Sequence, residues 1–289
     1  MVDLLRRCIP LTIYTLASAA AVNLDKSIVS GFISLETAGS YFLATTYSLV
    51  PVAVLSGPLN SYFAPRVAHA RHAGDAAGER RLATVFQTLL MCAVVGPSLS
   101  LGVQASEWLG LWLHEAPQGL LAVAPILLAG GALSATGYYP TTYLIAAGDN
   151  GYLARLSLVC SAGVLAAAVY FAVQGNLVGI AWSYFVFYAA GFAGLWARMG
   201  VMTGWTKLAG FLMKAYVLPA VAILASYIVS YAITRRLSWE VALVAPLAAA
   251  AASSLLVLVA AFFYERRIAG HSSVEGLSRG IDHDHHTYP

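Results

Sequence analysis

Eight long apolar runs in the sequence constrain what the chain can fold into. A helix needs about 20 consecutive apolar residues to cross the hydrocarbon core of a bilayer. Inside that core every backbone N–H and C=O needs a partner, which a helix supplies within its own segment. The sequence therefore predicts an all-α polytopic membrane protein with about eight transmembrane helices. The expected spans cover residues 9–33, 37–64, 83–105, 119–147, 153–173, 177–197, 211–233 and 241–264.

The composition supports this fold class. Of the 289 residues, 60% are hydrophobic and 10% are charged, whereas soluble domains carry about 25% charged residues. The net charge of +3 is spread along the chain without a basic patch for nucleic acid. The N-terminus opens like a signal peptide, but no small-residue cleavage site precedes Asp25, so the first run is expected to be a retained span.

Proline lies inside several of the eight runs, including Pro140 in the fourth and Pro219 in the seventh. A proline cannot donate a backbone hydrogen bond, so it frees a carbonyl one turn earlier and bends the helix. Membrane helices tolerate this where a neighbouring helix satisfies the freed group. The runs are therefore expected to be bent helices packed in one bundle.

The positions of lysine and arginine predict the orientation, because the cytoplasmic loops of membrane proteins are enriched in both. With a cytoplasmic N-terminus, 13 of the 16 basic residues fall on the cytoplasmic side. The opposite side then holds Arg235 and Arg236, while Lys26 lies within a span. An odd number of spans would place the later basic clusters outside. We therefore expect both termini to be cytoplasmic.

Three smaller features complete the domain plan. Residues 105–117 carry Trp108 and Trp112 four apart, which predicts a short helix in the outer interface. The polar tail 265–289 is expected to be disordered, and its His-Asp-His-His run to be incidental rather than a metal site. The three cysteines lack metal or redox spacing and are expected to be buried structural thiols: Cys8, Cys92 and Cys160.

An adjacent acid and base, Asp25 and Lys26, lie inside the first run. A charge at the bilayer centre costs about 3 kcal/mol on insertion scales. This run is rich in alanine, serine and threonine, so its apolar surplus does little to offset that cost. Such a helix is expected inside a bundle rather than against lipid.

The two charges fall on different faces of that helix. Turning 100° per residue separates Asp25 from Lys26, and neighbours at i and i+1 do not face each other. We therefore expect no ion pair between them. The Lys26 face is polar and is expected to meet water, whereas the Asp25 face is expected to pack against another helix. The alternative is that both are structural, or reach the outer surface about two turns away. The Lys26 face holds Thr12, Asn23, Ser27 and Ser30, and the Asp25 face holds Tyr14 and Ser18.

Several segments carry a family resemblance. Residues 24–70 join the Asp-Lys pair to "SLETAGSYFLA" and to a helix that ends in "FAPR". Residues 137–167 hold a tyrosine-rich helix end and a glycine-bearing turn, and "GNLVGIAWSYFVFYAAG" follows at 175–191. Over about residues 1–200, the chain resembles the second half of bacterial polysaccharide flippases. These are the O-antigen and lipid-linked oligosaccharide exporters of the multidrug/oligosaccharidyl-lipid/polysaccharide exporter superfamily.

The resemblance implies a transporter without a cofactor, in the bacterial inner membrane. Family members have two six-helix lobes around a cavity, and some add two C-terminal helices. They move an undecaprenyl-pyrophosphate-linked oligosaccharide to the outer leaflet by alternating access. Residues 1–200 would correspond to the second, C-terminal six-helix lobe, and residues 201–264 to the two extra helices that precede the polar tail. The first lobe has no counterpart here. The chain therefore pairs with a separately encoded lobe, self-associates, or is a truncated product that does not transport.

The substrate's chemistry selects candidate site residues. Lys26 is the candidate partner for phosphate. Arg66 lies where the substrate would arrive from the cytoplasm, although ordinary positive-inside anchoring explains it equally. Asp25 is the candidate for coupling to a proton or sodium, or else a carboxylate held by hydroxyls. The remaining candidates are polar groups for sugars, namely Asn23, Thr45, Ser48, Asn60, Tyr138, Tyr139 and Tyr143, of which the tyrosines also suit packing or an interfacial belt.

Other functions would place different requirements on the same residues. A multidrug exporter of the superfamily would carry organic cations, so Asp25 rather than Lys26 should line its cavity. A lipid II flippase would need more intramembrane cations than Lys26 alone. A third alternative is a non-transporting partner of polysaccharide polymerase and export proteins. An enzyme has the least support, because no HExxH, GxSxG or P-loop spacing is present.

Overall fold

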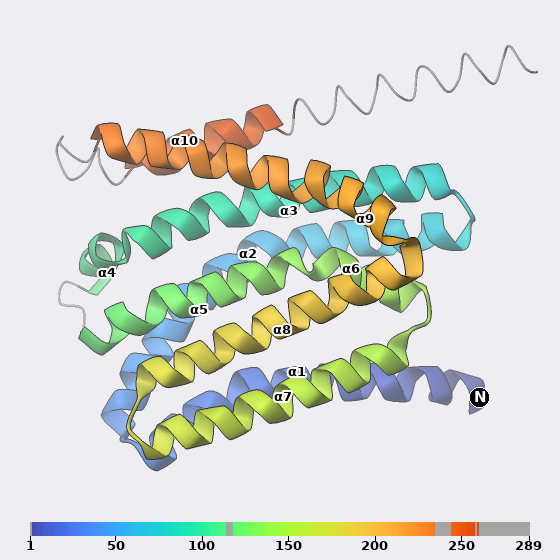
Figure 1. Cartoon of the computed structure of the whole chain (residues 1–289). Helices are drawn as coiled ribbons and strands as arrows, with labels where there is room; N and C mark the ends of the chain where they lie inside the picture. The colour runs from blue at the N-terminus through green and yellow to red at the C-terminus, as the bar shows by residue number, and fades with distance from the viewer. Residues whose placement is uncertain (1, 114–117, 235–243, 258, 260–289) are drawn as a thin grey trace, which may run out of the picture.

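The computed structural model describes residues 2–113, 118–234, 244–257 and 259. Within these ranges every regular element is a helix, which confirms the all-α prediction (Figure 1). The elements are α1 (Val2–Phe32), α2 (Leu35–His72), α3 (Ala76–Val103), α4 (Ala105–Leu113), α5 (Gln118–Thr136), α6 (Tyr138–Ala146), α7 (Asn150–Val173), α8 (Leu177–Thr203), α9 (Trp205–Leu212), the π-helical turn η1 (Met213–Val217) and α10 (Leu218–Thr234), with a further helix at Val244–Val257.

Seven of the eight expected spans correspond to helices that are long and apolar enough to cross a membrane. The eighth, 241–264, is described mainly as the shorter apolar helix Val244–Val257, and its remaining residues are largely outside the described part. The polar tail 265–289, with its histidine run, also lies outside the described residues. The chain is thus a multi-pass, all-α membrane protein.

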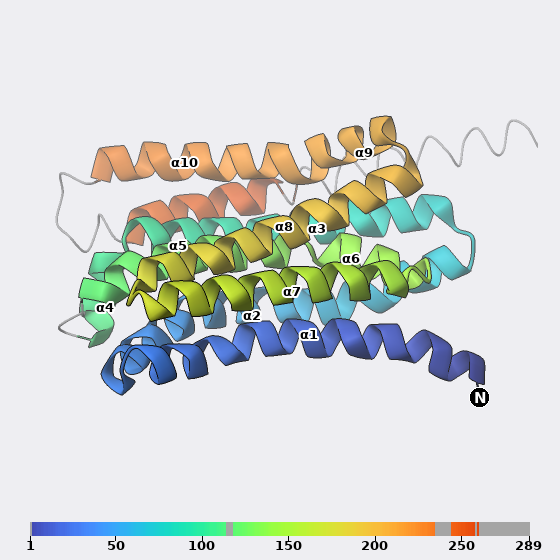
Figure 2. The same cartoon turned by 60° about the horizontal axis from the view of Figure 1, so that its bottom comes forward.

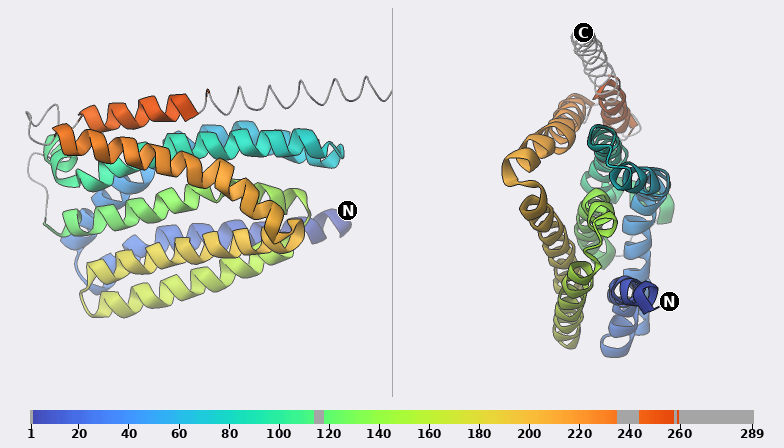
Figure 3. Two further views of the ribbon diagram at one scale, coloured as in Figure 1. Left: turned by 45° about the horizontal axis from the view of Figure 1, so that its top comes forward. Right: turned by 90° about the vertical axis from the view of Figure 1, so that its right-hand side faces the viewer.

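The helices run side by side along one direction, with α5 in the middle of the bundle (Figures 1 and 3). α5 packs against α2, α3 and α8, while α1 packs along α7 and more lightly on α2. α10 packs on α3 at the opposite edge from α1 (Figure 2). α1 is therefore a peripheral helix of the bundle, so the expectation that it lies inside is wrong. Its Cys8 is exposed rather than buried, whereas Cys92 is buried and Cys160 is half-buried.

Tight turns at Gly74, Gly148 and Gly175 join consecutive helices, with positive φ angles of 72°, 77° and 68°. This left-handed conformation suits glycine because it lacks a Cβ. Asp75 and Asn176 follow two of these glycines and cap the next helix by accepting a backbone N–H. The glycine-then-polar pairs in the sequence therefore mark where the chain reverses.

The fourth expected span is broken into α5 and α6 at Gly137. Pro140 has no N–H to donate to the carbonyl of Thr136 four residues earlier. That carbonyl instead accepts a hydrogen bond of 3.2 Å from Nε2 of Gln87, a fully buried side chain of α3. A neighbouring helix thus satisfies the group that proline frees.

Most basic positions in the described helices lie at the end of the bundle that holds the N-terminus. The α2–α3, α6–α7 and α8–α9 connections all lie at that end (Figure 1). Arg71, Arg155 and Arg198 lie close to these connections in the sequence. At the opposite end, α4 forms the expected short helix and runs across the bundle rather than along it. The fold therefore gathers most basic residues of the described helices at one end of the bundle.

Candidate functional site

α1 is the least buried of the long apolar helices. Only 11% of the 18-residue apolar stretch of α1 is buried within the chain, whereas the corresponding value for α3 is 50%. The exposed side of α1 includes the expected polar face, with Thr12, Asn23, Ser27 and Ser30 all exposed. The Asn23 amide donates to the carbonyl of Ala19 at 2.7 Å, within the same helix. An exposed strip of small and polar side chains is unusual for a lipid-facing surface.

The other side of α1 packs into the bundle, as the sequence predicts for the Asp25 face. Ser18 Oγ lies 2.9 Å from Ser157 Oγ of α7, and the Ser157 hydroxyl also lies 3.1 Å from the carbonyl of Tyr14. Further along the same stripe, Asp25 is only 2% exposed. Small hydroxyl-bearing residues let the two helices approach closely and hydrogen-bond across their contact.

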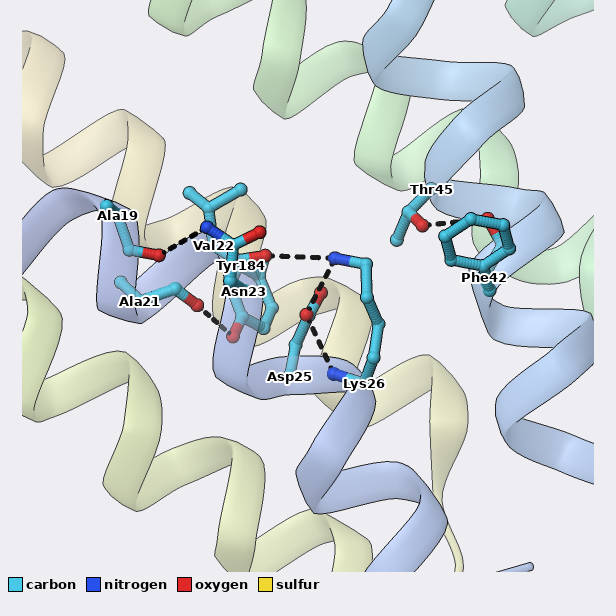
Figure 4. A network of polar contacts seen from close by, with 9 residues as sticks. All are labelled: Ala19, Ala21, Val22, Asn23, Asp25, Lys26, Phe42, Thr45 and Tyr184. Carbon is cyan, nitrogen blue, oxygen red and sulfur yellow. Dashed lines mark hydrogen bonds and ion pairs between the residues drawn. The ribbon is translucent and has the colours of Figure 1, made fainter. Parts of the chain in front are cut away.

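The prediction that Asp25 and Lys26 form no ion pair is wrong. Lys26 Nζ lies 2.9 Å from Oδ1 of Asp25 and donates a second bond of 3.0 Å to the carbonyl of Val22 (Figure 4). The Lys26 backbone N–H also donates to Asp25 Oδ1. The 100° rule describes where the Cβ atoms point, but the four-carbon lysine stem is long enough to turn back toward its neighbour.

The two members of the pair have different surroundings. The Lys26 side chain is 29% exposed, whereas that of Asp25 is 3% exposed. Hydroxyls from other helices face the carboxylate. Tyr184 of α8 donates to the carbonyl of Ala21 at 2.6 Å beside it (Figure 4), and the buried hydroxyl of Tyr41 in α2 faces it. The pair thus spans from the interior of the bundle to its surface.

Two of the polar candidates on α2, Thr45 and Ser48, are turned toward the interior. Ser48 is fully buried and donates to the carbonyl of Ala124 in α5 at 2.8 Å. Thr45 is 4% exposed and donates to the carbonyl of Phe42 in its own helix. Both therefore contribute to helix packing, and the structure does not bring them onto the exposed face that carries Asn23. Asn60 is half-buried, and its Oδ1 has no partner among the described residues.

Arg66 and the three tyrosines lie away from Lys26, toward the end that holds the N-terminus. Arg66 is exposed, donates to the carbonyl of Tyr62 and lies 3.6 Å above the Tyr62 ring. Tyr138 is half-buried, whereas Tyr139 and Tyr143 are buried in an aromatic cluster. These contacts favour the anchoring and packing interpretations of Arg66, Tyr139 and Tyr143.

Two partly exposed ion pairs at the end of the bundle that holds the N-terminus were not predicted from the sequence. Arg71 of α2 pairs with Glu79 of α3 at 2.9 Å and lies 3.9 Å above the ring of Tyr143 in α6. Arg198 pairs with Asp149 at 2.6 Å at the same end. The eight-residue separation of Arg71 and Glu79 across a Gly-Asp turn is the signal that identifies such a pair.

Two cavities within the chain lie apart from the Asp25–Lys26 pair. One of about 480 Å³ is open at the ends of α2 and α6, with His72 and Asn150 in its lining. The other, of about 80 Å³, lies between α1, α7 and α8, beside Ser18, Ser157 and Cys160. Neither is lined by Lys26 or Asp25, so the ammonium group is reached from the exposed side of α1.

Comparison of the chain with models of protein families, with curated proteins and with solved structures found no match.

Proposed function

We propose that this chain is one lobe of a polysaccharide flippase in the bacterial inner membrane. In this proposal it carries an undecaprenyl-pyrophosphate-linked oligosaccharide across the bilayer by alternating access. The end of the bundle that holds the N-terminus is cytoplasmic, as the positive-inside rule favours. The protein is a transporter, not an enzyme, and no cofactor takes part.

The observation that carries the proposal is the position of the Lys26 ammonium group. It lies within the apolar length of α1, on the exposed side, beside a strip of small polar side chains. A cation in this position suits the pyrophosphate of a lipid headgroup, because hydrogen bonds between ammonium and phosphate are charge-assisted. The strip that includes Asn23 and Ser27 suits the hydroxyls of the first sugars.

The exposed face of α1 also supports a two-lobe assembly. Lipid is a poor neighbour for a lysine and several hydroxyls, and α1 buries less of its surface within the chain than the other long apolar helices. A companion lobe facing α1 would enclose a hydrated cavity with Lys26 in one wall. We propose a separately encoded first-type lobe as this companion, with a second copy of the chain as the alternative.

The multidrug alternative is less well supported by the same geometry. An exporter of organic cations requires a carboxylate that faces its cavity, but Asp25 is 2% exposed and is paired with Lys26. The group that reaches the exposed side is the ammonium. This arrangement favours an anionic cargo.

A photo-crosslinking experiment tests the proposal. With p-benzoylphenylalanine in place of Asn23, cells that contain the assembled transporter are expected to yield an adduct with radiolabelled lipid-linked oligosaccharide. The matched control places the same group at Leu24, which is exposed but lies 100° around the helix. Equal yields at the two positions, or a yield at Asn23 that survives Lys26→Ala, would argue against a glycolipid site on this face.

A further inference from the structure

The ammonium group of Lys26 is shared between two acceptors on its own helix. It donates to Asp25 Oδ1 at 2.9 Å and to the Val22 carbonyl at 3.0 Å, which uses two of the three donors of an ammonium group. Its side chain is 29% exposed, so an anion arriving from outside the bundle can reach it. Such an anion competes directly with Asp25 for the same cation.

Asp25 cannot follow the ammonium group to the surface. Its carboxylate is 2% exposed, and its side chain points into the contact between α1 and the neighbouring helices. A buried charge that loses its partner is strongly destabilising, and a carboxylate in that position is neutralised by a proton instead. Departure of Lys26 from Asp25 therefore favours protonation of Asp25.

The groups that face this carboxylate supply no second cation among the described residues. They are Lys26 from α1, Tyr41 from α2, and Tyr184 and Tyr188 from α8. α7, which packs along α1, presents the Ser157 hydroxyl to Ser18 of α1 and contributes no charged group beside Asp25 within the described part of the chain. The buried Tyr41 hydroxyl faces Asp25, so it can accept a hydrogen bond from the carboxyl group once that group is protonated.

We infer that binding of an anionic headgroup at Lys26 is coupled to the uptake of one proton by Asp25. The inference rests on the proposed function, because it uses the same site for the pyrophosphate group. The anion draws the ammonium group away from Asp25, and the carboxylate takes a proton from water. The linkage is reciprocal, so a proton on Asp25 also strengthens anion binding. One adjacent pair of residues thus connects cargo binding to a proton.

Calorimetry tests this coupling with undecaprenyl pyrophosphate as the probe and the full chain in nanodiscs. Titrations in buffers of different ionisation enthalpy report the protons taken up per probe bound. The wild-type chain is expected to take up about one proton more per probe bound than Asp25→Asn. Any proton gained or lost by the probe itself contributes to both titrations, so Asp25→Asn is the matched control. Asp25→Asn is also expected to bind the probe about 10-fold more tightly, since its Lys26 is already released.

Infrared difference spectra of the wild-type chain provide a second test that needs no substitution of Asp25. Addition of the probe is expected to produce the carbonyl band of a protonated carboxylic acid, and Lys26→Gln is expected to lack it. Binding with equal proton uptake in wild type and Asp25→Asn, and without the band, overturns the coupling but leaves the proposed function standing. Failure of the wild-type chain to bind the probe, or equal binding by Lys26→Gln, overturns both.

Discussion

Replacement of Lys26 by alanine is expected to abolish complementation of a flippase-null strain by the assembled transporter, whereas Lys26→Arg is expected to retain part of the activity. A hydrogen bond to a charged group contributes about 1.5–3 kcal/mol, so its loss weakens headgroup binding about 10- to 150-fold. Arginine keeps the positive charge but presents it in a planar, wider group. Surface polysaccharide, measured by immunoblot, reports the difference.

The control for this experiment separates transport from folding. Lys26→Ala leaves Asp25 buried without its cation, which destabilises the bundle by itself. The double variant Lys26→Ala with Asp25→Asn removes both charges and is expected to recover monodisperse protein in detergent but not transport. Equal export by Lys26→Ala and Lys26→Arg, at equal protein level, would contradict the claim that the positive charge at position 26 binds the headgroup phosphate.

The chain expressed alone in a flippase-null strain is expected to export no glycan. A single lobe has no second wall, so the α1 face with Lys26 stays open to the bilayer. Co-expression with a first-type lobe is expected to restore surface polysaccharide, an effect of all or none. The measurement is surface glycan with and without the companion, at matched amounts of the chain in the membrane.

Self-association is distinguished in the same strains by crosslinking. If the chain assembles with itself, export without a companion should appear together with crosslinked dimers. Robust surface polysaccharide from a chain that crosslinking shows to be monomeric would contradict the requirement for a second lobe.

The membrane architecture was predictable because its signals are local. Apolar runs of about 20 residues define spans, and the Gly74–Asp75 and Gly175–Asn176 pairs define turns through conformations that few other residues favour. The helix break at Gly137 was less predictable. It depends on whether Gln87, on another helix, lies where it can satisfy the carbonyl freed by Pro140.

The candidate site was predictable only in part, because its details depend on packing and side-chain reach. The polar face of α1 followed from helical periodicity, and its exposure agrees with the expectation. The same periodicity suggested that Asp25 and Lys26 are independent, yet the flexible lysine stem joins them. Ser48 was a reasonable cavity candidate, but its hydroxyl donates to a backbone carbonyl of α5 instead. Periodicity identifies a face but not the helix that covers it.

The most direct test of the central claim is whether water reaches position 26 within the membrane. Lys26→Cys is placed in a background with Cys8, Cys92 and Cys160 replaced by serine, in the assembled transporter, and its labelling by a charged, water-borne thiol reagent is timed. Lys26→Cys is expected to be labelled at a rate well above that of Leu24→Cys, and more slowly when lipid-linked oligosaccharide is present. Complete protection of Lys26→Cys, at the level of Leu24→Cys, would contradict the central claim.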